Sequence, residues 1–170
     1  MRVTDKHVFF WGDFPSNWYP CHFIVERDGK ELEFFNSEQY FMYEKAMTFD
    51  DTDIAMRILF EGANPKKAKF LGRMVKNYDD KVWDEKRYQV MLDANMYKYS
   101  QSEELKEMLL NKEFNGKKFV EASPTDAIWG IRCREDEALD DESNWHGLNL
   151  LGKVLDEVRK KLKKNNKKKH

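Results

Sequence analysis

The stretch HFIVERDGKELEFFNSEQYFMYEKA (residues 22–46) decides the fold, because it places a strand signal directly before a helix signal. Residues 22–34 predict two short strands joined by Asp28-Gly29, a dipeptide that tolerates positive φ in a two-residue hairpin turn. Two further strand candidates would give a small sheet: KHVFFW (6–11) and KKFVEA (117–122).

The rest of the sequence predicts helices, beginning with the one after the hairpin. Asn36 and Gln39 form a capping box in which the Asn36 side chain accepts from a first-turn amide and the Gln39 side chain reaches back, so a helix is expected from Ser37 to about Met47. Caps and apolar spacing predict four later helices: one capped by Asp51 or Thr52 and ending at a left-handed Gly62, one from Asn64-Pro65, one from Asp80 to about Tyr99, and one capped by Ser102.

A last helix is predicted by an apolar stripe with steps of three and four residues: Leu148, Leu151, Leu155, Val158 and Leu162. With 170 residues the chain fits one domain. We therefore expect a mainly helical α+β fold: a single compact domain over residues 1–162 with a small N-terminal hairpin or sheet, and a basic, disordered tail over residues 163–170.

Charge is distributed unevenly. Residues 159–170 contain eight Lys/Arg and no acid, so 22 of the 30 bases and all 31 acids lie in residues 1–158, which carry about −9. This basic end could hold polyanions by counterion release, or it could simply be a frayed, solubilising terminus. The acidic run EDEALDDE (135–142) lacks a calcium-loop glycine and predicts a solvated loop rather than a metal site.

Cysteine usage and hydropathy suggest a location. Cys21 and Cys133 match neither a disulfide framework nor a metal-ligand spacing, which favours free thiols in a reducing compartment. The N-terminal residues contain no signal-peptide run, and no window approaches the roughly 20 apolar residues of a membrane span. A cytoplasmic protein with no membrane association is expected.

The first candidate site lies on the helix after the hairpin. Glu38, Met42 and Lys45 are spaced i, i+4 and i+7 and share one face, with Glu38 and Lys45 roughly 10 Å apart along the axis. They are too far apart to pair directly, but they could bracket a sugar and its phosphate. The alternative is that Glu38 only complements the helix dipole and that Lys45 pairs elsewhere.

The second candidate site lies in EASPTDAIWG (121–130), where a carboxylate, Asp126, stands beside Trp129-Gly130. The indole could stack on a base or ribose. The competing interpretation is that SPTD begins a helix. None of the four histidines lies in a metal or nucleophile pattern, so no catalytic triad and no metal site are predicted.

Three residues could seat phosphate. Gly147 and Asn149 precede the terminal helix, where exposed backbone amides would favour an anion, and Arg73 could supply a bidentate cation. The alternatives are a helix-terminating glycine and a surface arginine.

Six segments, in this order, resemble the NADAR family, the YbiA-like N-glycosidases: SNWYP (16–20), NSEQYFMYEKA (36–46), LGR (71–73), Trp83, EASPTDAIWGI (121–131) and WHGLNLLG (145–152). The resemblance spans about residues 9–162. It implies a compact, largely helical domain that cleaves N-glycosidic bonds without a metal or organic cofactor. The family's substrates are ADP-ribose attached to guanine, in nucleic acid or nucleotides, and phosphoribosylamino intermediates of riboflavin synthesis.

The resemblance also implies site residues. Glu38 falls on the family's acidic position and Lys45 on its lysine, with Asp126 as a possible second acid. The substrate-binding positions it implies are Asn17, Trp18, Arg73, Trp83, Trp129, Gly130, Gly147 and Asn149. Gln39 stands where some members have histidine and Arg132 where many have glycine, which leaves the substrate preference open.

Two mechanisms remain open at this point. Cleavage builds positive charge on the ribose carbon, so Glu38 could stabilise the transition state and activate water while Asp126 protonates the base. Lys45 could instead attack the opened sugar and form a Schiff base, if burial lowers its pKa. Two other functions also remain: a module that binds ADP-ribose without cleaving it, and a nucleic-acid-binding protein driven by the basic tail. The expected partners are an ADP-ribosyl or phosphoribosyl molecule and ADP-ribosylated DNA or RNA; the oligomeric state is not predicted.

Overall fold

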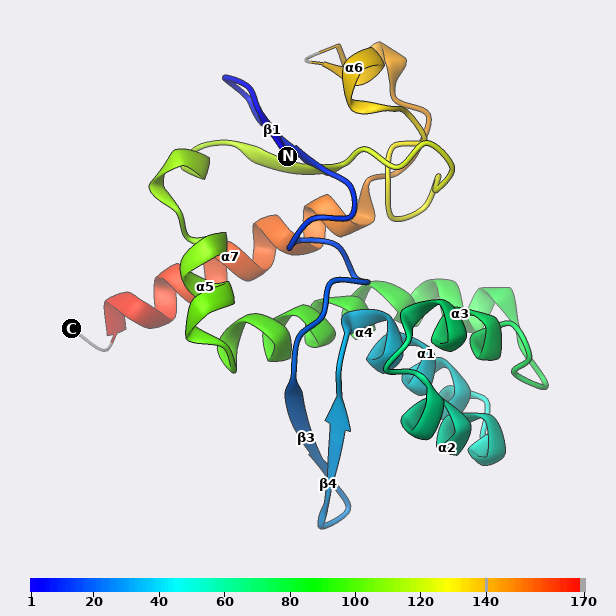
Figure 1. Cartoon of the computed structure of the whole chain (residues 1–170). Helices are drawn as coiled ribbons and strands as arrows, with labels where there is room; N and C mark the ends of the chain where they lie inside the picture. Colours follow the sequence, from blue (N-terminus) through cyan, green and yellow to red (C-terminus); the bar gives the residue numbers. More distant parts are fainter. Residues whose placement is uncertain (140, 169–170) are drawn as a thin grey trace. The chain divides into compact units, whose positions relative to one another are not determined.

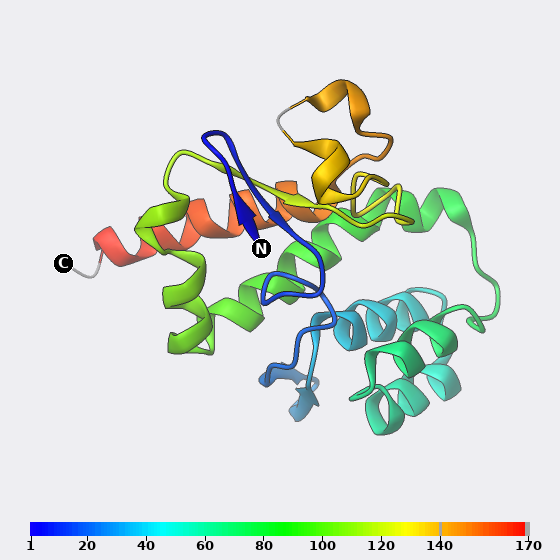
Figure 2. The same ribbon diagram turned by 45° about the horizontal axis from the view of Figure 1, so that its top comes forward.

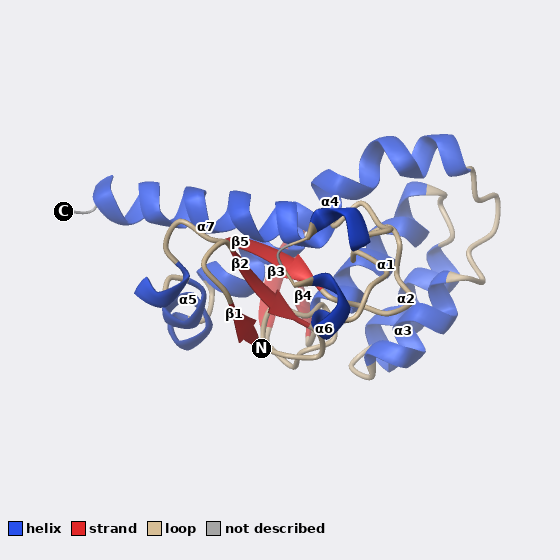
Figure 3. Cartoon of the chain, turned by 90° about the horizontal axis from the view of Figure 1, so that it is seen from above, coloured by secondary structure: helices blue, strands red, loops and turns tan. Residues whose placement is uncertain are grey.

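The computed structural model describes residues 1–139 and 141–168. The chain divides into two compact units: unit 1 comprises residues 1–16 and 103–170, and unit 2 comprises residues 17–102. Helices make up most of the regular structure (Figures 1 and 3), so the predicted mainly helical α+β class is confirmed. The sequence predicted one small sheet, but each unit has its own, because the hairpin strands pair only with each other.

Unit 2 begins with the predicted hairpin. Strands β3 (Phe23–Arg27) and β4 (Lys30–Phe34) pair antiparallel, with Val25 opposite Leu32. The two turn residues both have positive φ, 54° at Asp28 and 77° at Gly29, as a tight hairpin of native twist requires. The hairpin prediction is confirmed.

Helix α1 (Ser37–Thr48) begins at the predicted cap, where the backbone amide of Gln39 donates to Asn36 Oδ1 at 2.7 Å. The predicted return bond has a different partner. Gln39 Oε1 accepts from the Phe35 amide at 2.8 Å instead of the Asn36 amide, and Gln39 Nε2 donates to the Ile58 carbonyl at 3.0 Å. Gln39 is fully buried, so one side chain ties the end of the hairpin and α1 to the next helix.

Three further helices complete unit 2: α2 (Thr52–Glu61), α3 (Pro65–Gly72) and α4 (Asp80–Ser100). Asp51, not Thr52, caps α2, and Gly62 ends it. Gly62 was expected to be left-handed, but its φ is −81°. The position needs glycine because a Cβ there would overlap the Ile58 carbonyl and lie 2.8 Å from Gln39 Cγ. Figure 2 shows α1, α2 and α3 lying together.

The core of unit 2 is aromatic. Ring centroids are 5.5 Å apart for Phe23 and Phe34, 5.2 Å for Phe34 and Tyr40, and 5.6 Å for Tyr40 and Tyr97. Such pairs add about 0.5–1.5 kcal/mol each beyond the burial of their area. The hairpin, α1 and α4 are therefore joined through stacked and edge-on rings. On α4 the predicted face is buried at Trp83, Val90, Met91 and Ala94, while Tyr97 is half-buried.

Unit 1 is built on a three-stranded sheet of order β1-β2-β5. The predicted strands are confirmed as β2 (His7–Phe10) and β5 (Lys118–Glu121), which pair in parallel; β1 (Arg2–Val3), which was not predicted, pairs antiparallel with β2. The remaining elements are short helices and one long one: α5 (Glu103–Leu109), η1 (Lys112–Phe114), α6 (Glu135–Ala138), η2 (Glu142–Asn144) and α7 (Leu150–Lys168).

Helix α7 packs along β5 (Figure 3) and buries Leu151, Leu155, Val158 and Leu162, which confirms most of the predicted stripe. Leu148 is an exception, because it precedes the helix and is exposed. The predicted disorder of residues 163–170 is wrong as far as Lys168, where the helix continues. Residues 169–170 lie outside the described residues.

The acidic run was predicted to be a solvated loop. Its first residues instead form α6, a single turn with Ala138 buried, and its last begins η2. Residue 140, within the run, lies outside the described residues.

Candidate active site

In unit 2 the candidate site begins at the first turn of α1. Glu38 is buried, and its backbone amide donates to the Asn17 carbonyl at 3.1 Å, which ties α1 to the loop before the hairpin. Asn17 Oδ1 and Ser37 Oγ are buried and lack a hydrogen-bond partner among the described residues. An unpaired buried polar group costs about 1–3 kcal/mol and calls for an explanation. Both atoms belong to residues joined to Glu38, Ser37 in sequence and Asn17 through its backbone hydrogen bond.

Lys45 lies two turns further along α1 and is half-buried. Its Nζ is 4.5 Å from the centre of the Tyr78 ring. Burial lowers the pKa of Lys45, and the Arg73 cation lowers it further, while the carboxylates of Glu38 and Asp80 partly oppose the shift. A lysine acts as an amine nucleophile more readily when burial lowers its pKa, and burial lowers the pKa of Lys45.

Arg73 is positioned by a close helix contact. It follows Gly72 at the end of α3, and a Cβ at position 72 would overlap Met42 Sδ and lie 2.9 Å from Met42 Cγ. Met42 is on the α1 face between Glu38 and Lys45. The missing side chain at Gly72 thus lets α3 pack closely on this face, which explains how Arg73 comes to influence Lys45. Arg73 itself is exposed.

The two tryptophans assigned to unit 2 have different surroundings. Trp83 is buried, and its ring centroid is 5.0 Å from that of Phe41, so it packs in the core. Trp18 is 41% exposed. Of these two, only Trp18 offers an indole face that a ligand could reach.

In unit 1 the second candidate site is a series of tight turns rather than the start of a helix. Asp126 Oδ1 accepts from the amides of Ile128 and Trp129, both at 2.9 Å, and Ser123 Oγ accepts from the Asp126 amide at 3.1 Å. The Asp126 side chain therefore makes the bonds of a cap, as the competing interpretation held, but no helix follows it. One oxygen of the half-buried Asp126 carboxylate is already engaged in holding the loop that carries Trp129, itself half-buried.

Gly130 and Gly147 let two loop segments approach closely. A Cβ on Gly147 would overlap the Gly130 carbonyl and lie 2.9 Å from the Ala127 carbonyl, and a Cβ on Gly130 would lie 2.9 Å from the Glu121 carbonyl. The two segments are joined by four backbone bonds of 2.8–3.1 Å: Leu148 to Ala127, Asn149 to Gly130, Leu150 to Ile128, and Leu151 to Trp129.

These bonds correct one prediction. The amides of residues 148–151 donate to loop carbonyls, so they do not form the phosphate seat that the sequence suggested. The Asn149 side chain is also engaged: its Nδ2 donates to the Phe119 carbonyl and its Oδ1 accepts from the Glu121 amide, each at 3.0 Å. Asn149 holds a φ of 51°, which Asn tolerates better than most residues. Its role here is to lock the loop onto β5.

Arg132 is one of the two departures from the pattern that the resemblance implies. Its φ is 50°, in the left-handed region that glycine adopts without steric cost. Gln39, the other departure, is buried in contacts with backbone groups.

Sequence reasoning missed two residues beside Glu38 and Lys45. Ser37 carries one of the unpaired oxygens, and Tyr78 supplies the ring beneath Lys45; burial and the Asp80 carboxylate raise the pKa of Tyr78 to about 12. In the sequence, Ser37 is recognisable only as the first residue of a helix. Nothing in the sequence indicates that Tyr78 is near Lys45, because the two residues are far apart in the chain.

Over residues 1–139 and 141–168, no group of three or more His, Cys, Asp or Glu side chains is arranged to hold a metal ion. Among the same residues, no helix combines the length and apolarity needed to cross a membrane.

This chain is similar to known proteins over most of its length. The model of the NADAR domain matches residues 9–163, a range that includes parts of both units. Protein irg-1 of Caenorhabditis elegans is 44% identical over 160 residues, covering 86% of this chain and 74% of that protein. An N-glycosidase of Acanthamoeba polyphaga mimivirus is 39% identical over 166 residues, covering 92% of this chain and 96% of that protein.

The fold is also similar to a solved structure. The NMR structure of the E. coli protein YbiA matches with a TM-score of 0.76 and 28% identity, covering 99% of this chain and 92% of that one. The expected YbiA-like fold is therefore confirmed.

Proposed function

Because this chain belongs to the NADAR family, we propose that it is an N-glycosidase that releases ADP-ribose from ADP-ribosylated guanine in nucleic acid or nucleotides. The observation that carries the proposal is the charge arrangement on α1: a buried Glu38 and a partly buried Lys45 whose pKa is lowered by its surroundings, with Arg73 beside them. A relative that is 39% identical is named an N-glycosidase.

In the hydrolytic route Glu38 acts on the sugar. The bond between the anomeric carbon and the base nitrogen breaks, its electron pair stays on the nitrogen, and the sugar carbon becomes cationic. A buried carboxylate stabilises that charge more strongly than an exposed one and accepts the proton of the attacking water. The base nitrogen takes up a proton as it leaves, and Asp126 stays our prediction for its donor.

In the covalent route the sugar ring opens and leaves its anomeric carbon joined to the base nitrogen as an imine. Lys45 attacks that carbon as a neutral amine, the bond to the base nitrogen breaks, and the base leaves as an amine with the two protons from Nζ. A new imine then links the sugar to Nζ, and water hydrolyses it to release the sugar aldehyde and regenerate the Lys45 amine. A lowered pKa favours this route because it increases the neutral fraction near neutral pH. Arg73, exposed beside Lys45, is suited to a substrate phosphate.

The substrate test uses two reactions. The protein is incubated with an oligonucleotide carrying ADP-ribosylated guanine and, separately, with a phosphoribosylaminopyrimidine, and the released sugar phosphates are quantified by chromatography. We expect ADP-ribose from the first. Turnover of only the second would replace the proposed substrate, and saturable binding without any product would indicate a binding module.

The residue test compares Glu38→Gln and Lys45→Ala with matched changes at exposed positions of α4, Glu85→Gln and Lys86→Ala. We expect each site variant to lower turnover by about 100-fold or more, the scale of a lost acid–base or nucleophilic group, while the controls keep wild-type turnover. Borohydride added during turnover should attach the sugar to the peptide containing Lys45 only if the covalent route operates. Full activity in both site variants would refute the assignment.

A further inference from the structure

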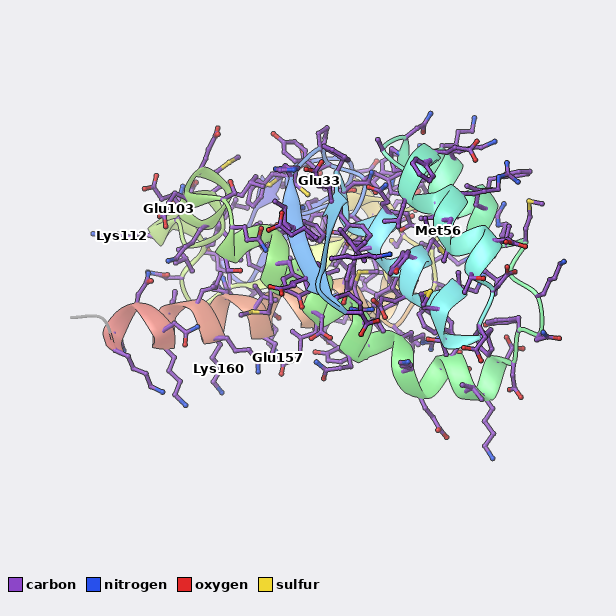
Figure 4. The ribbon with its side chains drawn as sticks, turned by 90° about the horizontal axis from the view of Figure 1, so that it is seen from below. Glu33, Met56, Glu103, Lys112, Glu157 and Lys160 are labelled. Carbon is purple, nitrogen blue, oxygen red and sulfur yellow. The ribbon has the colours of Figure 1, made fainter. Side chains whose placement is uncertain are left out.

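The C-terminal half of α7 forms one side of a basic groove in unit 1. The groove has a volume of about 500 Å³ and is lined by Gly116, Asp156, Arg159, Lys160, Lys163, Lys164 and Lys167. Figure 4 shows the α7 side chains, with Lys160 labelled, projecting from the helix. The basic residues recur at steps of one, three and four, so the helix gathers them on one face.

Most of this positive charge is not neutralised. Arg159 is engaged, because its guanidinium donates to the Phe114 and Lys117 carbonyls and pairs with Asp156 at 3.3 Å. Lys163 donates to a neutral partner, Asn115 Oδ1, at 2.7 Å. Within the described residues, Lys160, Lys163, Lys164 and Lys167 form no ion pair with a carboxylate.

The cations also oppose one another. Burial lowers the pKa of Lys163, and the neighbouring charges of Arg159 and Lys167 lower it further. A helix that extends through Lys167 holds these like charges together, whereas a disordered tail would let them separate. An anion in the groove would relieve that repulsion.

The spacing suits a strand of phosphates. Lys160 and Lys167 are seven residues apart, roughly 10 Å along the helix, which corresponds to about three nucleotides at 3.4 Å per nucleotide of one strand. A membrane surface fits less well, because membrane-surface helices expose an apolar face and the apolar stripe of α7 is buried in unit 1.

We infer that the groove formed by Lys160, Lys163, Lys164 and Lys167 binds the sugar–phosphate backbone of a nucleic acid strand. This inference rests on the proposed function for its role in catalysis, since it assigns the nucleic-acid form of ADP-ribosylated guanine as the preferred substrate.

The groove lies at a defined distance along α7 from the loop that carries Trp129. The amides of Leu150 and Leu151 bind that loop, and Lys163 is 13 residues beyond Leu150, roughly 20 Å along the axis. A strand that reaches from the loop to the groove needs about six nucleotides. Short oligonucleotides and nucleosides should therefore not sense the groove.

The binding test uses a fluorescein-labelled, unmodified 20-nucleotide single-stranded DNA, followed by anisotropy at several salt concentrations. The variant is Lys160→Gln/Lys163→Gln/Lys164→Gln/Lys167→Gln, and the control removes the same charge from exposed lysines of unit 2, Lys30→Gln/Lys66→Gln/Lys69→Gln/Lys81→Gln. We expect the groove variant to bind at least tenfold more weakly. Its slope of log K against log salt should be smaller by about 2–3, from about 0.7 per lost phosphate contact.

The catalytic arm compares kcat/KM for ADP-ribosylated guanine within the 20-mer and within a nucleoside. The groove variant should lose activity on the strand only. Unchanged strand affinity, an equal loss in the control, or binding to phosphatidylserine vesicles but not to the strand would overturn the inference. If no hydrolysis is found, the proposed function fails, while the binding arm still decides the groove.

Discussion

The protonation of Lys45 depends on its burial and on three charged neighbours. Burial and Arg73 lower its pKa, whereas Glu38 and Asp80 raise it. These opposing effects give the covalent route a signature in the pH dependence of the rate.

If Lys45 reacts as a neutral amine, kcat should rise with pH through its lowered pKa and then level off. Arg73→Gln removes a cation, so the pKa of Lys45 should rise and the ascending limb should move to higher pH. Glu38→Gln removes an anion and should move any residual limb the other way. A pH–rate profile that shows no ascending limb, or limbs that do not move, would favour hydrolysis led by Glu38.

Lys98 is a second unusual lysine, and sequence reasoning did not single it out. Its side chain is fully buried, with Nζ 5.8 Å from the centre of the Tyr19 ring and 5.0 Å from that of Tyr99. Burial lowers the pKa of Lys98 to about 8, although the Cys21 thiol partly opposes this. The folded protein therefore releases this proton at lower pH than the unfolded chain does.

The free energy of unfolding should consequently rise by about 1 kcal/mol between pH 8 and 9, because the unfolded lysine stays protonated until about pH 10.4. The partly buried Cys21, with a pKa raised to about 11, acts in the opposite direction from the pH at which an unfolded thiol begins to titrate, about 8.5, so the rise is read as the difference between wild type and the Lys98 variant. Urea unfolding of wild type and Lys98→Met at both pH values measures the effect. A rise of the same size in Lys98→Met would show that another group causes it.

At the scale of elements, the loop over residues 127–131 depends on segment 146–151 for its shape. The backbone bonds between them and the Asn149 side chain fix the loop against β5. Residues 127–131 and 146–149 lie outside the helices and strands, and Leu150 and Leu151 begin α7.

Gly147→Ala should destabilise the protein by about 1–3 kcal/mol, since the new methyl group would overlap a backbone carbonyl of Gly130 that has little freedom to move. The control is Gly72→Ala, whose methyl group would meet the end of the flexible Met42 side chain and should cost less. Urea unfolding of both variants tests this. An equal or smaller loss for Gly147→Ala would contradict the proposed lock.

The elements themselves were largely predictable. The Asp28-Gly29 turn and the Asn36 cap act through neighbouring residues, so their hairpin and helix were placed correctly. Gly62 and the Gln39 return bond were assigned the wrong geometry because each is decided by contacts between α1 and α2, about 20 residues apart in sequence.

At the scale of the whole chain, unit 2 interrupts unit 1 in sequence. Strands β2 and β5 pair in parallel in unit 1, and all of unit 2, residues 17–102, lies between them in the sequence. If unit 2 unfolded alone, that connection would become a long flexible loop with a higher closure entropy. Unfolding of one unit is therefore expected to destabilise the other.

The two cysteines can report on this coupling, because Cys21 is in unit 2 and the buried Cys133 is in unit 1. Burial raises the pKa of both thiols, so the reactive thiolate is scarce at either cysteine while its unit is folded, and labelling should speed up when the unit opens. In Cys21→Ser and Cys133→Ser, each with one thiol left, the unfolding-limited labelling rates should be equal. Clearly different rates would mean that the units open independently.

The sequence by itself determined most strands, most helices, the family resemblance and the placement of Glu38 and Lys45 on one helix face, because these follow from residues a few positions apart. Only the tertiary structure decided how exposed each candidate residue is and which of its polar atoms already have partners. It placed Trp83 in the core, engaged Asn149 with Phe119 and Glu121, lowered the pKa of Lys45, and extended α7 so that its lysines line a groove. Burial and hydrogen-bond partners come from segments distant in the chain, and local sequence patterns carry no record of them.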